Sequence, residues 1–368
     1  INLVMSTETR LQALLQTTPA WLKTGGPIED VVVSARVRLA RNVADRAFPE
    51  QLADEDAEDI LAATASVLRQ CDIDGNILEV RSLSDSAKEF VLERNLASRE
   101  LLNVERPTML FYGMRGAHSV MINEEDHFRI QGISKGLDLE SALRRAQRVE
   151  RVLAEAHEFA TSKDYGYLTS CPTNTGSGMR ASIMLHLPAL ARAKAPLQRS
   201  LQAARAAGLA VRGVHGEGSR AIGHLYQISN QRTLGSSSSD QLLAVSNYGH
   251  EVASYERSIR QQYCDDTRAR VALTVDLKQA LKQIKEVQQM TTRQSLTFLS
   301  LINLGINTGV CQEIGFSMNP HRLLQLSFAV QPGHLQMAAA ISMNADQRDT
   351  ARADRMRLEL GFSDGRSA

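Results

Sequence analysis

Segments of this chain alternate between apolar residues and arginine or small polar residues, which is the two-residue period of a β-strand. The clearest one is 30–39. In it, one face is expected to carry Val33, Ala35, Val37 and Leu39 and the other Ser34, Arg36 and Arg38. Strands of this kind build sheets with one apolar face packed on a core, so the arginine face is left for another use.

Further strands are expected at 119–123, 128–133, 167–171, 180–187, 209–213 and 224–229. Helices are expected at 6–21, 54–69, 138–160 (with Asp138 as N-cap) and 197–207, where apolar residues recur with helical spacing. Because the helices interrupt the strands irregularly, the pattern favours an α+β fold with an antiparallel sheet.

The pattern changes after 235–240, a serine-rich stretch that is either a linker or the N-cap region of the next helix. Beyond it, helices are expected at 240–263, 276–289, 291–303, 320–330 and 346–360. We therefore expect two domains: 28–250, with the sheet and its flanking helices, and a helical C-terminal domain at 251–368.

Composition excludes several classes of protein. The 42 Lys and Arg residues nearly balance the 41 Asp and Glu residues, so no nucleic-acid or acidic-membrane partner is expected. The four cysteines form no C-x-x-C pair, which argues against a zinc site or a disulfide framework. No apolar run approaches the roughly 18 residues of a membrane span, and no secretory signal is visible, so the expected location is the cytoplasm. The P-loop motif and the motifs of ordinary protein kinases are absent.

Five arginines lie on the polar faces of the expected strands. They are Arg36, Arg38, Arg129, Arg180 and Arg212. A sheet face with several guanidinium groups needs anionic partners, because unpaired buried charge is costly. Two interpretations remain open. The arginines pair with Glu29, Asp30, Glu124 or Asp126 across the sheet, or they bind the phosphates of a ligand.

Three turns lie beside these arginines. The turn 123–127 groups three carboxylates, which a metal ion or a cationic substrate would neutralise unless the turn is simply solvated. The turn 171–178 is rich in glycine and offers backbone N–H groups, as anion-binding nests do. The third, 212–218, places an arginine and a lone carboxylate among three glycines.

Four ordered motifs resemble the guanidino-kinase (phosphagen kinase) superfamily, from about residue 28 to 360. They are Ser34-x-Arg36-x-Arg38, Asn123-Glu-Glu-Asp-His-x-Arg129, Cys171-Pro-Thr-Asn-x-Gly-x-Gly-x-Arg180-Ala-Ser182 and Arg212-Gly-x-x-Gly-Glu217. The resemblance implies a phosphagen-kinase-like catalytic domain with an antiparallel sheet.

Within the superfamily the chain looks most like the bacterial protein-arginine kinases. Only 33 residues precede Ser34, which is too few for the helical domain that carries part of the small-substrate pocket in creatine and free-arginine kinases. In addition, the residues Arg348-Asp349-x-x-Arg352-Ala353 match the family's phosphoarginine-binding motif. Arg348, Arg352 and Arg355 share one face of the expected helix, and without the family match that face is a solvated basic stripe.

By this resemblance the reaction is the transfer of the γ-phosphate of ATP, with Mg²⁺, to arginine side chains of proteins. The ATP-binding residues are then Ser34, Arg36, Arg38, Arg129, Arg180, Ala181, Ser182, Arg212, Gly213 and Gly216. The catalytic residues are Glu125, Glu217 and Cys171, and no residue is assigned to a metal. One departure is Asn95, which stands where the family has a histidine near the adenine.

The resemblance also implies partners: a zinc-finger activator protein, a Clp-type protease that degrades the marked proteins, a stress repressor as substrate, and a homo-oligomeric state. Two alternatives remain open, namely a small-molecule guanidino kinase and a catalytically silent adaptor that binds phosphoarginine.

Overall fold

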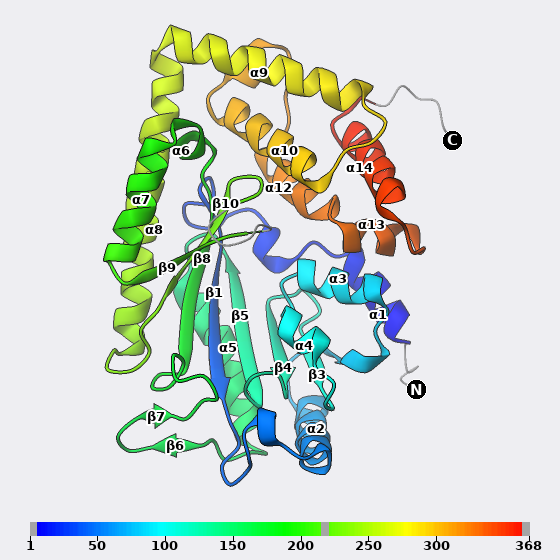
Figure 1. Cartoon of the computed structure of the whole chain (residues 1–368), viewed down its shortest axis with the longest axis vertical. Helices are drawn as coiled ribbons and strands as arrows, with labels where there is room; N and C mark the ends of the chain where they lie inside the picture. The colour runs from blue at the N-terminus through cyan, green and yellow to red at the C-terminus, as the bar shows by residue number, and fades with distance from the viewer. Residues whose placement is uncertain (1–5, 215–220, 363–368) are drawn as a thin grey trace.

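The computed structural model describes residues 6–214 and 221–362, and within them an eight-stranded antiparallel sheet forms the centre of the molecule (Figure 1). Its strand order is β2-β3-β4-β5-β1-β8-β10-β9. The strands are β1 (Val32–Arg41), β2 (Asn76–Glu79), β3 (Met109–Tyr112), β4 (His118–Ile122), β5 (Phe128–Lys135), β8 (Met179–His186), β9 (Leu209–Gly213) and β10 (Leu225–Asn230). A separate hairpin contains β6 (Thr161–Ser162) and β7 (Gly166–Tyr167). The predicted antiparallel α+β architecture is confirmed.

Two long helices, α5 (Leu139–Ala154) and α8 (Ser238–Asp265), cover the apolar face of the sheet. Asp138 caps α5 as predicted, because its carboxylate accepts the Ser141 amide at 2.9 Å. The helix nevertheless ends at Ala154, six residues earlier than expected. Contact between α5 and β5 is close: a Cβ on Gly132 would lie 2.1 Å from the Ala142 carbonyl oxygen. The arginine-bearing strands are therefore held firmly from behind.

The first strand contains an irregularity that alternation did not reveal. The pairing of β1 with β8 shifts between Val32 and Ser34, so that an extra residue is accommodated there. As a result Val33 does not share the face of Ala35, as predicted, but packs in a cluster on the opposite face with Trp21 and Phe328. That prediction was wrong, and the bulge is its physical cause.

The N-terminal segment is not one helix. The helix α1 (Thr7–Leu15) stops before Thr17, Thr18 and Pro19, and a 3-10 turn, η1 (Ala20–Leu22), follows it. The predicted helix at 54–69 is α2 (Asp54–Gln70), and the helix at 197–207 is α7 (Ala195–Ala206). The expected strand at 167–171 ends at Tyr167. Shorter helices complete this part: α3 (Asp85–Glu93), α4 (Arg99–Asn103), α6 (Pro188–Ala193) and the 3-10 turns η2 (Pro49–Gln51) and η3 (Val80–Ser82).

The C-terminal part is helical, as predicted. It contains α9 (Thr267–Glu286), α10 (Thr292–Asn307), α11 (Val310–Glu313), α12 (Pro320–Ala329), α13 (Pro332–Ala339) and α14 (Ala345–Glu359). Ser237 caps α8 by accepting the Asp240 amide at 3.1 Å, so 235–240 is an N-cap region rather than a linker. Residue 250 lies inside the continuous helix α8, and the division into 28–250 and 251–368 stays a prediction. No helix within the described part of the chain is long and apolar enough to span a membrane.

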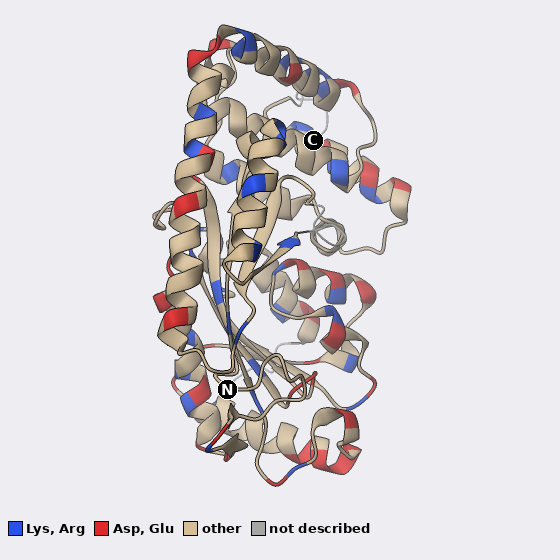
Figure 2. Ribbon diagram, turned by 60° about the vertical axis from the view of Figure 1, so that its left-hand side comes forward, with Lys and Arg blue, Asp and Glu red and all other residues tan. Residues whose placement is uncertain are grey.

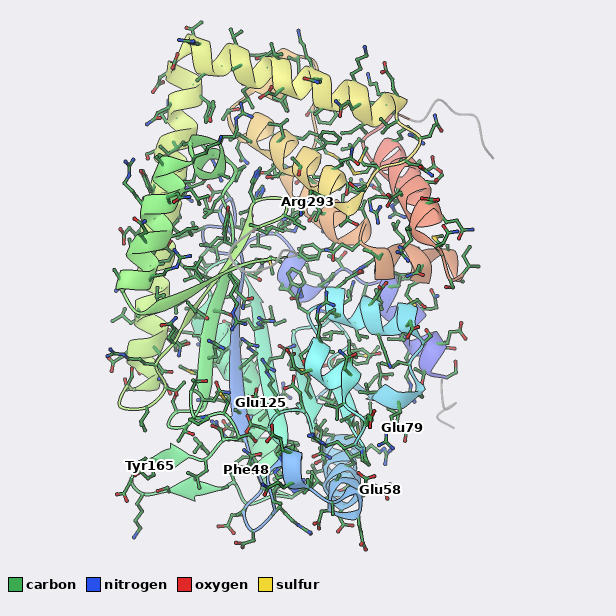
Figure 3. All side chains as sticks on the ribbon, viewed as in Figure 1. Phe48, Glu58, Glu79, Glu125, Tyr165 and Arg293 are labelled. Atoms are coloured by element: carbon green, nitrogen blue, oxygen red, sulfur yellow. The ribbon has the colours of Figure 1, made fainter. Side chains whose placement is uncertain are left out.

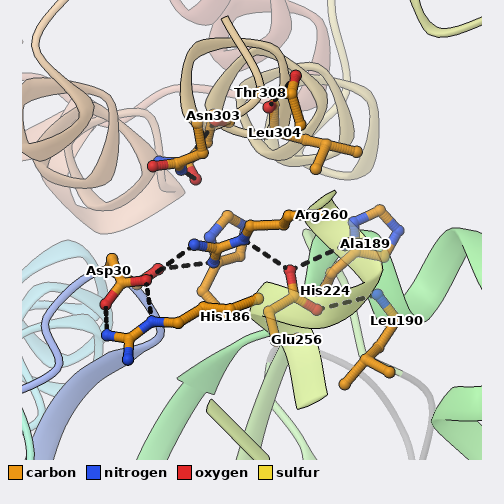
Figure 4. Close-up of polar contacts among 12 residues, drawn as sticks. Asp30, His186, Ala189, Leu190, His224, Glu256, Arg260, Asn303, Leu304 and Thr308 are labelled. Atoms are coloured by element: carbon orange, nitrogen blue, oxygen red, sulfur yellow. Dashed lines mark hydrogen bonds and ion pairs between the residues drawn. The ribbon is translucent and has the colours of Figure 1, made fainter. Parts of the chain in front are cut away.

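Polar side chains fasten the sheet to the C-terminal helices. In Figure 4, Asp30 accepts hydrogen bonds from Arg257 and Arg260, and Glu256 on α8 accepts the first amides of α6, Ala189 at 3.0 Å and Leu190 at 2.9 Å. These contacts tie the start of β1 and the end of β8 to α8.

A second fastening lies at the end of β8. The Ser300 hydroxyl of α10 lies 2.8 Å from His186 Nε2 and 2.7 Å from His224 Nδ1. His186 ends β8 and His224 directly precedes β10, so one buried hydroxyl on a C-terminal helix joins two strands. We refer to His186, His224 and Ser300 as the joint.

The joint predicts a stability difference between two serines of α10. Ser300→Ala should lower the free energy of unfolding by about 1–3 kcal/mol, because it leaves two buried imidazole nitrogens without their partner. Ser295→Ala is the matched control, since Ser295 is equally buried but bonds only the Thr292 carbonyl of its own helix. Denaturant unfolding of both variants measures the difference, and equal losses would contradict the role of the joint.

Buried histidines also predict the pH dependence of stability. Burial lowers the pKa of His186 to about 3 and that of His127 to about 4. Both remain neutral in the folded chain while the unfolded chain takes up protons below its pKa near 6.5, so stability should fall as the pH is lowered from 7 to 5.5. Each of these two groups should contribute about 1 kcal/mol to that loss. Thermal unfolding across this range tests the expectation, with a His127→Gln variant expected to show a shallower dependence.

Candidate active site

Strand register brings four of the five arginines onto one patch of the sheet. Arg38 on β1 lies directly opposite Arg180 on β8, and Arg36 is two residues from Arg38 on the same face. Arg129 on β5 lies opposite Ala40, one step further along β1. Arg212 comes from the edge strand β9, opposite Gln227. Figure 2 shows basic positions along these central strands. We call these five residues the arginine face.

Most of the arginine face has no counter-ion. Among the described residues, no carboxylate lies within 4.0 Å of Arg36, Arg38, Arg180 or Arg212. Burial, followed by repulsion from Arg129 and Arg180, lowers the pKa of Arg36 to about 10. Burial and the neighbouring guanidinium groups likewise hold the pKa of Arg38 well below its usual range. Adjacent like charges destabilise a sheet, so this arrangement is suited to an anionic ligand.

Only one of the expected ion pairs is present. Arg129 Nη1 lies 2.8 Å from both carboxylate oxygens of Glu124, and this buried carboxylate raises the pKa of Arg129 although burial opposes it. Asp30 instead pairs with Arg257 and Arg260, and Glu29 accepts the Gly26 amide. The alternative in which carboxylates neutralise the arginines across the sheet therefore holds for Arg129 alone within the described chain.

The acidic turn between β4 and β5 is not a solvated turn. Glu124 is buried and also accepts a hydrogen bond from Ser98. Asp126 is buried and accepts the Asn42 amide group at 2.7 Å and the Ser170 backbone amide at 2.8 Å. Asn123 adopts a left-handed φ of 59°, which turns the chain sharply before the carboxylates. This leaves Glu125 as the exposed carboxylate of the three.

Glu125 has the environment of a proton acceptor. Partial burial, and then the carboxylates of Asp126 and Glu124, raise its pKa above the ordinary value, while Arg129 and the Cys171 thiol act in the opposite direction. Cys171 Sγ lies 2.9 Å from the Thr173 hydroxyl. The negative charges near Arg180 include those of Cys171 and Glu125, so the turn meets the arginine face at this point. Figure 3 shows Glu125 toward the lower end of the sheet.

The glycine-rich turn 171–178 differs from the expected anion nest. The amides of Asn174, Thr175, Gly176 and Ser177 all donate to protein carbonyl groups. The Gly176 φ of 113° and the 2.5 Å approach of the Thr233 carbonyl to a would-be Cβ explain the glycine there. The turn therefore fixes Cys171 and the start of β8 rather than presenting these amides to a ligand.

Other predicted site residues are divided between the two faces. Ser34 and Ser182 lie on the same side as Arg36, and the Ser182 hydroxyl donates to the Arg36 carbonyl at 3.3 Å. The Ala181 side chain packs in the core on the opposite face, and its amide donates to Asn230 Oδ1 at 2.7 Å. Gly213 ends β9. Gly216 and Glu217 lie outside the described residues.

Sequence reasoning missed residues that surround the arginine face. Trp21, Asn95 and Gln227 line a narrow cavity together with Ser34, Arg36 and Ser182. Asn95, the residue that departs from the family pattern, thus lies beside Arg36. Trp21 arrives there because of the β1 bulge and the break after α1, neither of which leaves a periodic signal. Asn42, which orders the acidic turn by bonding Asp126 and the His127 amide, directly follows β1.

The motif at 348–353 is part of the core of the helical region. The buried Arg352 guanidinium donates to the Met290 carbonyl at 2.7 Å and the Val330 carbonyl at 2.8 Å, and it pairs with Asp349. The Ala353 side chain is fully buried. Arg348 is partly exposed and donates one hydrogen bond, to the Met343 carbonyl at 2.9 Å. This face of α14 is therefore not a solvated basic stripe.

Comparison with known proteins gives two family matches that together span most of the chain. The family model described as "ATP:guanido phosphotransferase, C-terminal catalytic domain" matches residues 56–259, and the "Protein-arginine kinase McsB C-terminal domain" matches residues 270–367. The protein-arginine kinase of Bacillus pumilus is 35% identical over 348 residues, which cover 92% of this chain and 94% of the relative. That of Syntrophomonas wolfei is 35% identical over 339 residues, 90% and 92% of the two chains.

Solved structures show a similar fold. Lombricine kinase superposes with a TM-score of 0.57 at 20% identity, over 67% of this chain and 72% of its own. The duplicated taurocyamine kinase of Schistosoma mansoni gives a TM-score of 0.57 at 23% identity, over 75% of this chain and 40% of its own. The phosphagen-kinase-like fold expected from the sequence is confirmed.

The uneven pairing of the arginines predicts opposite effects of two matched substitutions. Arg38→Met removes a guanidinium without a counter-ion and should leave the fold as stable or raise its melting temperature. Arg129→Met leaves the buried Glu124 carboxylate unpaired and should cost about 3–5 kcal/mol. Thermal unfolding in a buffer free of phosphate and sulfate distinguishes them. Equal destabilisation would show that Arg38 has an unrecognised partner.

Proposed function

The chain belongs to the protein-arginine kinase family of ATP:guanido phosphotransferases, and from this we propose that it transfers the γ-phosphate of ATP to arginine side chains of proteins and that the arginine face is where ATP binds. The observation that carries the assignment of the site is the set of guanidinium groups without counter-ions on adjacent strands. A triphosphate would supply the missing negative charge. Planar guanidinium groups bind phosphate oxygens in pairs, which also fixes the orientation of the transferred group.

The individual arginines would divide this work. Arg38 has a buried Nε–H group with no acceptor among the described residues, so it is prepared to donate to a phosphate oxygen. Arg36 and Arg180 flank it, and Arg129 is held in place by Glu124. Charge that develops on the transferred phosphoryl group is stabilised by donors that are already oriented. Ser34, Ser182, Arg212, Gly213 and Gly216 complete the proposed ATP-binding set, with Ala181 contributing to the packing behind it.

Magnesium would enter with the nucleotide. Within the described residues, no three His, Cys, Asp or Glu side chains are grouped so that they could hold a metal ion. The donor set of the arginine face fits phosphate oxygens rather than a cation, so we assign Mg²⁺ to the phosphates themselves, where it would screen their charge.

Glu125 is the proposed base for the acceptor arginine. A guanidinium group is a poor nucleophile until it loses a proton, and its pKa exceeds about 12 in water. We propose that Glu125 and Glu217 hold the guanidinium by charge-assisted hydrogen bonds and that one of them takes the proton as the N–P bond forms and the bond from Pγ to the ADP oxygen breaks. The raised pKa of Glu125 suits this transfer. Cys171, next to Glu125, would position the acceptor rather than form a covalent intermediate.

The motif at 348–353 is proposed to bind phosphoarginine. Arg348 is the accessible guanidinium of the motif, whereas Arg352 and Ala353 hold α14 in place behind it. Asp349 is partly exposed and is the group suited to the guanidinium part of phosphoarginine. Family membership further supports a cytoplasmic enzyme and a homo-oligomer that works with a zinc-finger activator and a Clp-type protease and acts on a stress repressor.

Substitution of Glu125 tests the mechanism. Glu125→Gln preserves the size of an exposed side chain, so the fold should be unaffected, while kcat should fall by roughly 100-fold or more because the proton acceptor is lost. Mass spectrometry under non-acidic conditions, after incubation with MgATP and a protein mixture, detects the acid-labile phosphoarginine. Glu58→Gln, an exposed position on α2, is the matched control and should retain full activity.

The same assay separates the alternatives. Faster phosphorylation of free arginine or creatine than of proteins would indicate a small-molecule kinase. Complete absence of phosphoarginine, even with an activator present, combined with binding of phosphoarginine peptides, would indicate an adaptor. Full activity of Glu125→Gln would refute the role given to Glu125.

A further inference from the structure

A cavity of about 210 Å³ lies between the N-terminal segment and the C-terminal helices, away from the catalytic turn. Its walls come from residues 15–22, the end of α3, and α12, α13 and α14. Much of the lining is apolar and includes Leu15, Leu22, Phe328 and Ala329. Neither Arg348 nor Arg352 of the phosphoarginine motif lines it, and neither does any member of the arginine face.

Polar groups that line the cavity have unused hydrogen-bond donors. Trp21 is 1% exposed, and its indole N–H has no acceptor among the described residues. The buried Nε–H of Arg355 likewise has no acceptor there, although Arg355 Nη2 pairs with Glu359 at 2.9 Å. Native proteins satisfy the great majority of their buried polar groups, so two orphaned donors at one cavity call for a ligand atom or ordered water.

Arg94 adds a third donor and a positive charge. It is 4% exposed and, within the described chain, lies in no ion pair. Its terminal nitrogens both donate to the Thr17 carbonyl at 3.0 Å, which leaves further N–H groups unused. Burial lowers the pKa of Arg94 to about 10, so the group remains charged at neutral pH.

The carboxylate that lines the cavity is already committed. Glu93 accepts the Gly333 amide at 2.8 Å, the His334 amide at 2.9 Å and the His334 ring at 2.8 Å. It therefore caps α13 and leaves little capacity to accept from a ligand. What the cavity offers a ligand is a set of donors on an apolar background.

We propose that this cavity binds a small organic anion, one in which a carboxylate or phosphate group is attached to an apolar body. The anionic oxygens would accept from Trp21, Arg94 and Arg355, and the body would lie against Leu22 and Phe328, whose neighbour Trp21 packs edge-on at 5.0 Å from the Phe328 ring. Such a ligand contacts the N-terminal segment, the catalytic part and the C-terminal helices at once, so it stabilises the folded chain by mass action.

The chain's single tryptophan provides a direct test, because Trp21 is that residue. Benzoate and phenyl phosphate are titrated into the intact protein while tryptophan fluorescence is followed. A saturable change is expected. Arg355→Gln should weaken the binding of both probes by at least roughly 10-fold, since one charge-assisted hydrogen bond is lost. Arg293→Gln, an exposed arginine of α10 (Figure 3), is the matched control and should bind as the parent protein does.

Two further variants distinguish the cavity from the arginine face, which also attracts anions and shares Trp21 as a neighbour. Arg180→Gln should leave probe binding unchanged. Trp21→Phe retains the ring contact with Phe328 and deletes only the N–H group, so calorimetry should show weaker binding at an unchanged melting temperature of the free protein. Loss of binding in Arg180→Gln but not in Arg355→Gln would overturn the proposal, as would no saturable signal with the folded parent protein. All these readouts are independent of kinase activity.

Discussion

Positive charge without counter-ions on a packed sheet is the constraint from which the rest of this structure follows. Guanidinium groups on neighbouring strands repel one another, and the described chain supplies a carboxylate to Arg129 alone. The strands that carry them must therefore be held together by other interactions. The apolar opposite face provides these, with α5 in close contact at Gly132 and α8 across β8 and β10. Catalytic competence and fold stability thus make opposite demands on the same residues.

The acidic turn shows how one buried pair serves that arrangement. Glu124 and Asp126 are withdrawn into the protein by Arg129, Ser98, Asn42 and the Ser170 amide. Their removal from solvent leaves Glu125 alone at the surface, yet their charges are close enough to raise its pKa. A cluster that seems redundant in the sequence is in fact one reactive carboxylate with two structural neighbours.

Periodicity predicted what periodic contacts determine, and failed where single contacts decide. The faces of β5 and β8 follow the alternation of the sequence, and so does the separation of Arg180 from Ala181. Val33 does not, because one extra residue in β1 reverses the alternation locally. The burial of Arg352 was equally invisible, since its partners are backbone carbonyls at positions 290 and 330 that no side-chain pattern encodes. Motif order predicted the catalytic turn, whereas Trp21 and Asn42 reach the site through tertiary contacts alone.

The helix α8 carries a consequence for how such proteins evolve. It runs without interruption from the sheet to the C-terminal helices, and the joint and Asp30 bind the two parts on either side of it. The two regions that family comparison separates are therefore not interchangeable cassettes. Recombination between relatives near residue 260 would yield a working chimera only if the partners of His186, His224 and Asp30 were inherited together, which ties the histories of the two regions to one another.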